Sequence, residues 1–134
     1  KLANLLNNLQ KKSIYITNKN IKNLKYVKFI KPCSKKKFYN ILNISNAIIS
    51  AAGQTCLEAL YLKKNILIFR TSPNQNNNIK FLNKNNFKTY KNINKFLKNK
   101  KKASRILKRL IQNSQKKIFI KNGVSTISNI LKKL

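Results

Sequence analysis

Residues 48–60 read IISAAGQTCLEAL, and this stretch decides the fold. It opens with a short apolar run that ends at Ala51, Ala52 and Gly53, which is typical of a buried strand followed by a turn. A helical pattern begins at about Thr55 and continues to about residue 64. In open α/β sheets, a turn that contains glycine often connects a strand to the helix that follows it. Ligands of such sheets bind beyond the carboxyl ends of the strands. The stretch therefore predicts an α/β fold and the position of its site.

The alternation of strands and helices continues on both sides of this stretch. Besides the strand at residues 47–50, we expect short apolar strands at residues 13–17, 25–30, 66–69 and 87–90. We expect helices near residues 2–9, 38–42, 74–85 and 106–111, and a terminal helix that begins after Gly123. This order predicts a Rossmann-like parallel sheet flanked by helices on both faces, in a single domain that spans residues 1–134.

The composition excludes most catalytic chemistry. The chain has 134 residues, 31 of them Lys or Arg, and it has no His and a single acidic residue, Glu58. A carboxylate pair, a Ser-His-Asp triad, a Cys-His dyad and a metal site built from His or carboxylates all need residues that are absent. We therefore expect no catalytic residue, no metal and no cofactor in this chain, and a reaction here needs an acid or base from elsewhere.

The formal net charge of +30 invites a nucleic-acid interpretation, because lysine and arginine neutralise phosphates. The basic residues, however, are spread from Lys1 to Lys133. Lysine, asparagine and isoleucine dominate the chain, and they are the residues of A/T-rich codons. We therefore favour a compositional bias on a solvated surface over a specific nucleic-acid partner, and a basic nucleic-acid-binding module stays an alternative.

Other absences bear on the setting of the protein. Cys33 and Cys56 have neither the spacing of metal ligands nor the density of a disulfide scaffold, which favours a reducing cytoplasm. No apolar run approaches the roughly 18 residues of a membrane span, so we expect no integral membrane segment. The sequence lacks methionine and opens on a helical pattern at Lys1, from which we expect the C-terminal part of a longer protein.

The turn at Gly53 has the chemistry of a nucleotide site. Glycine lets a ligand approach the backbone closely. The N–H groups near Gln54 and Thr55, together with the helix dipole, suit a diphosphate. Glu58 lies one turn into the helix, where a carboxylate can accept two hydrogen bonds from a ribose diol.

Two structural interpretations compete with this one. Thr55 and Glu58 also have the spacing of a capping box, in which the carboxylate bonds to the backbone at the start of the helix. Gly53 could equally belong to an ordinary strand-to-helix turn. We favour a ligand contact for Glu58 because the composition has removed every other acid, including those at helix starts, where acids are stabilising.

Residues 49–60 (ISAAGQTCLEAL), followed after one strand by residues 73–78 (PNQNNN), resemble the donor-binding half of GT-B glycosyltransferases. Within that superfamily the chain looks most like the UDP-sugar hydrolases of pseudaminic acid biosynthesis, over roughly residues 10–134. The resemblance implies a C-terminal nucleotide-sugar-binding domain whose N-terminal half, with the catalytic histidine, is missing. It implies release of UDP from a diacetamido-trideoxy sugar nucleotide, and a GT-B transferase resembling the N-acetylglucosaminyltransferase of peptidoglycan is an alternative.

The resemblance also implies roles for individual residues. A first group of four residues would line the diphosphate, and Glu58 would hold the ribose hydroxyls. A second group, in the loop after the next strand, would face the sugar and the phosphates. The first group is Ser50, Gly53, Gln54 and Thr55, and the second is Asn74, Gln75 and Asn78. Phe29 and Ile30 map loosely to a uracil contact, with core packing as the alternative. Residues 63–65 (KKN) replace the family's Gly-x-Pro, which puts that turn in doubt.

Overall fold

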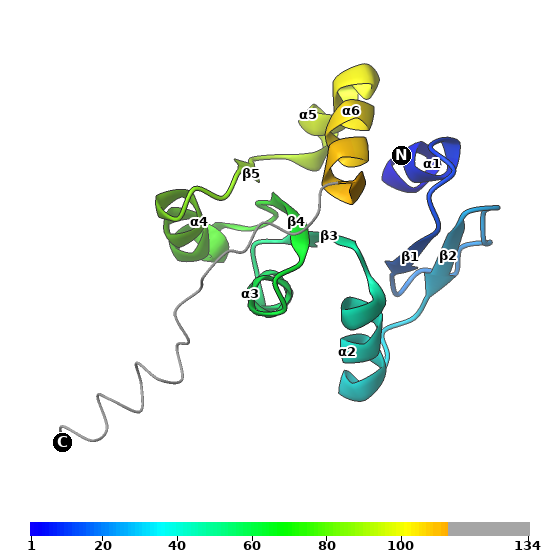
Figure 1. Cartoon of the computed structure of the whole chain (residues 1–134), viewed down its shortest axis with the longest axis horizontal. Coiled ribbons are helices and arrows are strands. Elements are labelled where there is room, and N and C mark those ends of the chain that lie inside the picture. The colour runs from blue at the N-terminus through cyan, green and yellow to red at the C-terminus, as the bar shows by residue number, and fades with distance from the viewer. Residues whose placement is uncertain (113–134) are drawn as a thin grey trace.

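The computed structural model describes residues 1–112 (Figure 1). Its strands are β1 (Ser13–Ile16), β2 (Val27–Ile30), β3 (Ala47–Ala51), β4 (Asn65–Phe69) and β5 (Thr89–Tyr90). Its helices are α1 (Leu2–Asn8), α2 (Lys35–Ile44), α3 (Gln54–Tyr61), α4 (Asn76–Lys84), α5 (Ile93–Lys98) and α6 (Lys100–Gln112), with a short 3-10 helix, η1 (Pro73–Gln75). The terminal helix expected after Gly123 lies outside the described residues.

The strands form two parallel sheets instead of the single sheet that we predicted. β1 pairs with β2, and β3, β4 and β5 form a second sheet in that order. Every pair is parallel, as the alternation of strands and helices predicts. The mixed α/β class is thus confirmed, and the sheet is divided because no strand among residues 1–112 pairs between β1 and β3.

Hydrophobic clusters cover both faces of β4. Leu67 and Phe69 pack into a cluster that includes buried residues of α1, β2 and α6. Ile68 points the other way and packs with Cys56 of α3 and Leu82 of α4. This alternation follows from the period of two in a strand, and it places α1 and α6 on one face and α3 and α4 on the other.

Three aromatic rings hold α5 against the sheet. The ring centroids of Phe69, Tyr90 and Phe96 lie 5.1–5.6 Å apart, with Phe96 edge-on to the other two. The sequence pattern did not predict α5. Its N-cap is Asn92, whose side chain accepts hydrogen bonds from the N–H groups of Asn94 and Lys95.

The helix ends at α1, α3 and α4 share one geometry. In each, the residue after the C-cap has a left-handed backbone, with φ of 54° at Gln10, 55° at Lys63 and 62° at Asn86. At the end of α3 the N–H of Lys63 donates to the carbonyl of Leu60, and the N–H of Lys64 donates to the carbonyl of Ala59. These are the two hydrogen bonds of a Schellman motif. The turn at residues 63–65 therefore keeps a glycine-type conformation although lysine replaces the glycine.

Candidate functional site

The turn between β3 and α3 presents free backbone donors. Gly53 is the N-cap of α3, and no side chain caps this helix. Within residues 1–112 the N–H groups of Gln54 and Thr55 have no hydrogen-bond partner. Because these groups lie at the positive end of the helix dipole, the turn can bind an anion.

Gly53 has an ordinary backbone conformation, with φ −101° and ψ −159°, which other residues can adopt. A Cβ built on Gly53 would meet no atom within 4 Å. Neither backbone strain nor packing against the described chain therefore requires glycine here. The space that the missing side chain leaves is not filled by any described residue.

The capping box that the spacing of Thr55 and Glu58 allows is not formed. Thr55 lies inside α3, and the N-cap is Gly53. Glu58 instead accepts a hydrogen bond from the side chain of Gln54, with 3.2 Å between Nε2 and Oε1. Its half-buried carboxylate forms no ion pair within residues 1–112. The only acidic side chain of the protein thus lies one helical turn from the free donors. Within residues 1–112 it bonds to the Gln54 side chain and to no backbone N–H group of the helix start.

The loop after β4 lies next to this turn. Ala51 is in register with Phe69, so the two loops leave the sheet at the same level. Asn78 of α4 connects the loops, because its side-chain amide donates to the carbonyl of Ala52 at 2.8 Å. This bond makes Asn78 a positioning residue for the turn.

The other two amides predicted for the site are engaged within their own loop. The Gln75 side chain accepts from the N–H of Thr71 at 2.9 Å and donates to the Thr71 hydroxyl at 3.0 Å. Asn74 accepts a hydrogen bond from the hydroxyl of Ser72. A ligand contact by Asn74 or Gln75 stays a prediction, and it needs these bonds to be exchanged or shared.

The structure thus gathers most of the predicted residues. Ser50, Gly53, Gln54, Thr55, Glu58 and Asn78 all lie on the β3–α3 turn or against it, with the Ser50 hydroxyl donating to the carbonyl of Ala51 at 2.9 Å. Asn74 and Gln75 lie in the neighbouring loop, in η1.

Arg70 is a site candidate that the sequence pattern did not single out. It follows β4 directly, as Ala52 follows β3 after the last paired residues of the two strands. Its backbone N–H donates to the carbonyl of Tyr90 at 2.8 Å. Its side chain is half-buried. A guanidinium at the carboxyl end of the strand next to β3 suits a phosphate group, since arginine binds phosphate through two parallel hydrogen bonds. The available signal was an arginine directly after a buried strand in a chain whose cations are almost all lysines.

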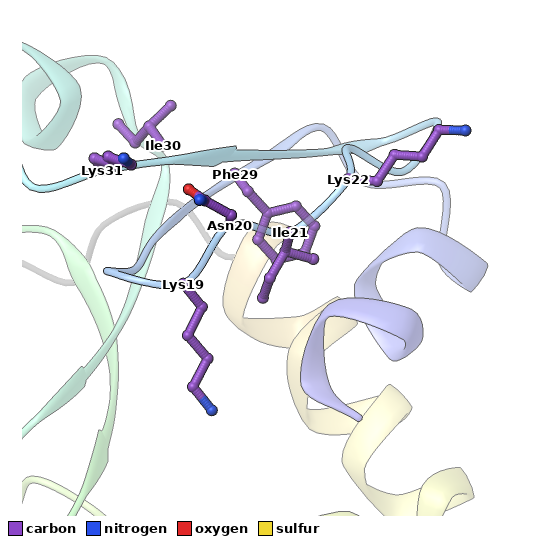
Figure 2. Close-up of a pocket in the computed structure, with 7 residues that line it drawn as sticks. All are labelled: Lys19, Asn20, Ile21, Lys22, Phe29, Ile30 and Lys31. Atoms are coloured by element: carbon purple, nitrogen blue, oxygen red, sulfur yellow. The ribbon is translucent and has the colours of Figure 1, made fainter.

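Phe29 and Ile30 line a pocket of about 370 Å³ at the end of β2 (Figure 2). The ring of Phe29 overlaps the side chain of Ile21 in this view, while Lys19 and Lys22 extend away from them. Phe29 also packs into the core, with its ring centroid 5.5 Å from that of Tyr15. The core role of Phe29 is therefore present, while the uracil contact stays a prediction.

Cys56, one residue beyond Thr55, takes no part in the surface chemistry of the turn. It is fully buried, and this burial raises the pKa of its thiol to about 11. Within residues 1–112 there is no group of His, Cys, Asp or Glu that could hold a metal ion. Over the same part of the chain, no helix is both long enough and apolar enough to cross a membrane.

The chain matches no protein-family model, no curated protein and no solved structure.

Proposed function

We propose that this chain is a UDP-sugar-binding domain of a cytoplasmic GT-B hydrolase that releases UDP from a diacetamido-trideoxy sugar nucleotide. The observation that carries the proposal is the β3–α3 turn. Within residues 1–112 it combines free N–H groups at Gln54 and Thr55, an open space at Gly53 and a carboxylate, that of Glu58, which forms no ion pair.

The spacing of these groups favours a nucleotide over a simple anion. Glu58 lies four residues beyond Gln54, which is about 6 Å along a helix. A free phosphate bound by the N–H groups would be repelled by a carboxylate at that distance. A ligand with negative charge at one end and hydroxyl groups at the other satisfies both ends of the site, and a nucleoside diphosphate has this form.

Each part of the site would have a separate task in hydrolysis. The N–H groups and Arg70 would stabilise the charge that develops on the leaving UDP, while Glu58 would orient the ribose. Water would attack the anomeric carbon. The base that activates this water would come from the N-terminal half of the enzyme, since the chain has no histidine.

The ribose assignment is tested by calorimetry of the Glu58→Gln variant. UDP affinity should fall by about 10- to 150-fold, which corresponds to the 1.5–3 kcal/mol of a hydrogen bond to a charged group. Pyrophosphate affinity should not fall, because that ligand has no hydroxyl groups for Glu58 to bind and the substitution removes a carboxylate that repels it. Pyrophosphate therefore serves as the internal control for folding of the variant.

A second comparison uses ligands that lack ribose hydroxyls. The unmodified chain should prefer UDP to 2′-deoxy-UDP and 3′-deoxy-UDP, and the Glu58→Gln variant should lose much of this preference. Unchanged UDP affinity in the variant would refute the ribose contact. Binding of RNA with a steep salt dependence, without UDP binding, would favour a nucleic-acid-binding module instead. Transfer of the sugar to an acceptor by the complete enzyme would favour the transferase.

A further inference from the structure

One edge of β1 carries backbone groups without a partner strand. The N–H of Ser13 donates to the carbonyl of Tyr26, so the odd-numbered residues of β1 direct their backbone groups towards β2. Because this direction alternates along a strand, the N–H groups of Ile14 and Ile16 point away from β2. Among the described residues no strand pairs on that side.

One edge of β3 is open in the same way. The N–H of Ala52 donates to the carbonyl of Phe69 at 3.0 Å, so the even-numbered residues face β4. The N–H groups of Ile49 and Ala51 therefore point to the opposite side, where residues 1–112 supply no partner strand.

The other strand edges are closed, which makes these two exceptional. On the outer edge of β2, the N–H of Val27 donates to the carbonyl of Leu24, and that of Phe29 donates to the side chain of Asn23 at 2.8 Å. The strand at the far edge of the second sheet, β5, is only two residues long. Protection by side chains and very short edge strands are the usual ways in which proteins prevent edge pairing. The open edges of β1 and β3 are longer, and within residues 1–112 their outward N–H groups have no partner, although the carbonyl of Ala51 accepts a hydrogen bond from the Ser50 hydroxyl.

The two open edges belong to one packed unit. Val27 of the first sheet and Leu67 of the second share a hydrophobic cluster with Leu6 of α1 and Leu107 of α6. Figure 1 shows α1 and α6 next to each other on the same side of both sheets. The sheets are therefore neighbours under common helices, although no strand pairing among residues 1–112 joins them.

The connection into β1 indicates what lies between them. Parallel strands are linked by crossovers, usually helices, and α1 leads directly into β1 on the face that it shares with α6. The strand before such a helix usually pairs beside the strand after it, and crossovers are right-handed. One side of β1 is already taken by β2. The strand that precedes α1 would therefore occupy the open side.

We propose that a further β-strand, formed by the polypeptide that leads into α1, pairs in parallel between β1 and β3 and joins the two sheets into one. The strand order becomes β2, β1, the added strand, β3, β4, β5. This inference does not rest on the proposed nucleotide ligand.

The added strand also explains the position of the Gly53 turn. From the added strand the chain proceeds to β1 and β2 on one side, whereas from β3 it proceeds to β4 and β5 on the other. The order reverses between the added strand and β3. Ligands of open α/β sheets bind at this switch point, outside the carboxyl ends of the strands, and Gly53 lies just beyond the carboxyl end of β3.

The test attaches a probe strand to the full chain. An extension ahead of Lys1 carries a run of alternating valine and isoleucine as long as β3, followed by a short glycine-asparagine turn. Buried parallel strands have this apolar character. The matched control has an extension of the same length made of glycine and serine. Amide hydrogen exchange is followed residue by residue by NMR.

The apolar extension should slow exchange at Ile14, Ile16, Ile49 and Ala51 by at least about tenfold relative to the control, as expected for amides that gain a ladder partner. Amides that already bond to β2 or β4, such as those of Ser13 and Ser50, report any general gain in stability. Equal rates at the four edge amides in the two extended chains would overturn the proposal. Protection confined to β2 or β5 would also overturn it, since the strand would then pair at an outer edge.

The same apolar segment, added as a free peptide to the unmodified chain, gives a second measurement that does not depend on folding of the extended chain. Selective protection of the same four amides supports the proposal. Saturating peptide without such protection counts against it.

Discussion

Gly53 is a residue whose role can be separated into fold and ligand. Its Cβ position is empty and its φ is negative, so Gly53→Ala creates no clash within the described chain. Alanine is a poorer N-cap than glycine but restricts the unfolded chain, and these effects oppose each other. We expect the free energy of unfolding to change by less than about 1 kcal/mol.

UDP binding should respond differently to the same substitution. The added methyl group occupies the space through which a diphosphate approaches the N–H groups, so the Kd for UDP should rise at least about tenfold, or 1.4 kcal/mol. Urea denaturation and calorimetry on one preparation measure both effects. A variant that binds UDP as well as the unmodified chain would show that the ligand does not approach the turn over Gly53.

Cys56 and Cys33 should differ in reactivity. Burial raises the pKa of the Cys56 thiol to about 11, while Cys33 is only half-buried. Since the thiolate is the reactive form, an alkylating reagent at pH 8 should modify Cys33 and leave Cys56 intact in the folded chain. Mass spectrometry of the digested protein, with urea-unfolded chain as the control, measures this selectivity. Rapid modification of Cys56 without urea would contradict its burial.

The same thiol makes the stability depend on pH. In the unfolded chain Cys56 releases its proton near pH 9, whereas the folded chain retains it up to about pH 11. The stabilisation from this group is therefore complete below pH 9 and is lost as the pH rises towards 11. A Cys56→Ala variant should be less stable because packing is lost. Its free energy of unfolding, measured by urea titration, should nevertheless decline less between about pH 9 and pH 11 than that of the unmodified chain.

At the scale of single residues, the sequence predicted positions better than contacts. Glu58 was distinctive because no other acid is present, and the structure places it one turn from the free donors. The amides of Asn74, Gln75 and Asn78 were predicted to face a ligand, yet each bonds to the protein. Spacing along the chain does not determine such bonds, because they depend on how the loop after β4 folds back beside the β3–α3 turn.

At the scale of elements, the helix ends are a place to gain stability. Gln10 has a left-handed backbone after α1, where an L-residue other than glycine is strained by roughly 1–2 kcal/mol. Gln10→Gly should therefore raise the free energy of unfolding by about 1 kcal/mol. Asn86→Gly is the matched control at the end of α4, and its gain should be smaller because asparagine tolerates this conformation. Urea denaturation measures the free energy of unfolding of both variants. An equal gain in the two variants, or a loss in Gln10→Gly, would contradict the strain at Gln10.

The elements themselves were predictable where the apolar pattern was clear. All five expected strands form, and β4 extends from Asn65 to Phe69 against a prediction of residues 66–69. The strand expected at residues 87–90 is reduced to Thr89–Tyr90. The helix α5 was missed because it is only six residues long, which is too short for a periodic pattern to stand out. Its cap at Asn92 was hidden among many asparagines.

At the scale of the whole molecule, charge of one sign dominates. With a net charge of +30, repulsion among lysines opposes the compact state, and salt screens this repulsion. The urea midpoint should therefore rise with added NaCl, mostly between about 10 and 200 mM, where the Debye length falls from about 30 Å to below about 8 Å. A midpoint that increases linearly into molar salt would instead indicate a general solvent effect.

The division of the sheet was the main feature that the sequence did not predict. The pattern of apolar runs identifies strands and their parallel direction, but it contains no information on which edges meet. Ile14 illustrates this limit, since it reads as part of a buried strand yet is 43% exposed. Its neighbour Tyr15 packs against the cluster of α1 and α6, so Ile14 lies on the opposite face of β1, and local sequence does not specify what covers that face.

The cluster that joins Leu2 and Leu6 of α1 to Leu107 of α6 determines the order in which the protein can form during translation. Each sheet pairs only strands from its own stretch of chain, β1 with β2 and β3 with β4 and β5, so each can assemble as soon as that stretch has left the ribosome. α1 is synthesised first among these elements but gains its packing against α6 only when residue 107 has emerged. Its leucines therefore stay without that cover for most of the synthesis, and this exposed apolar surface favours aggregation of the nascent chain until α6 has formed.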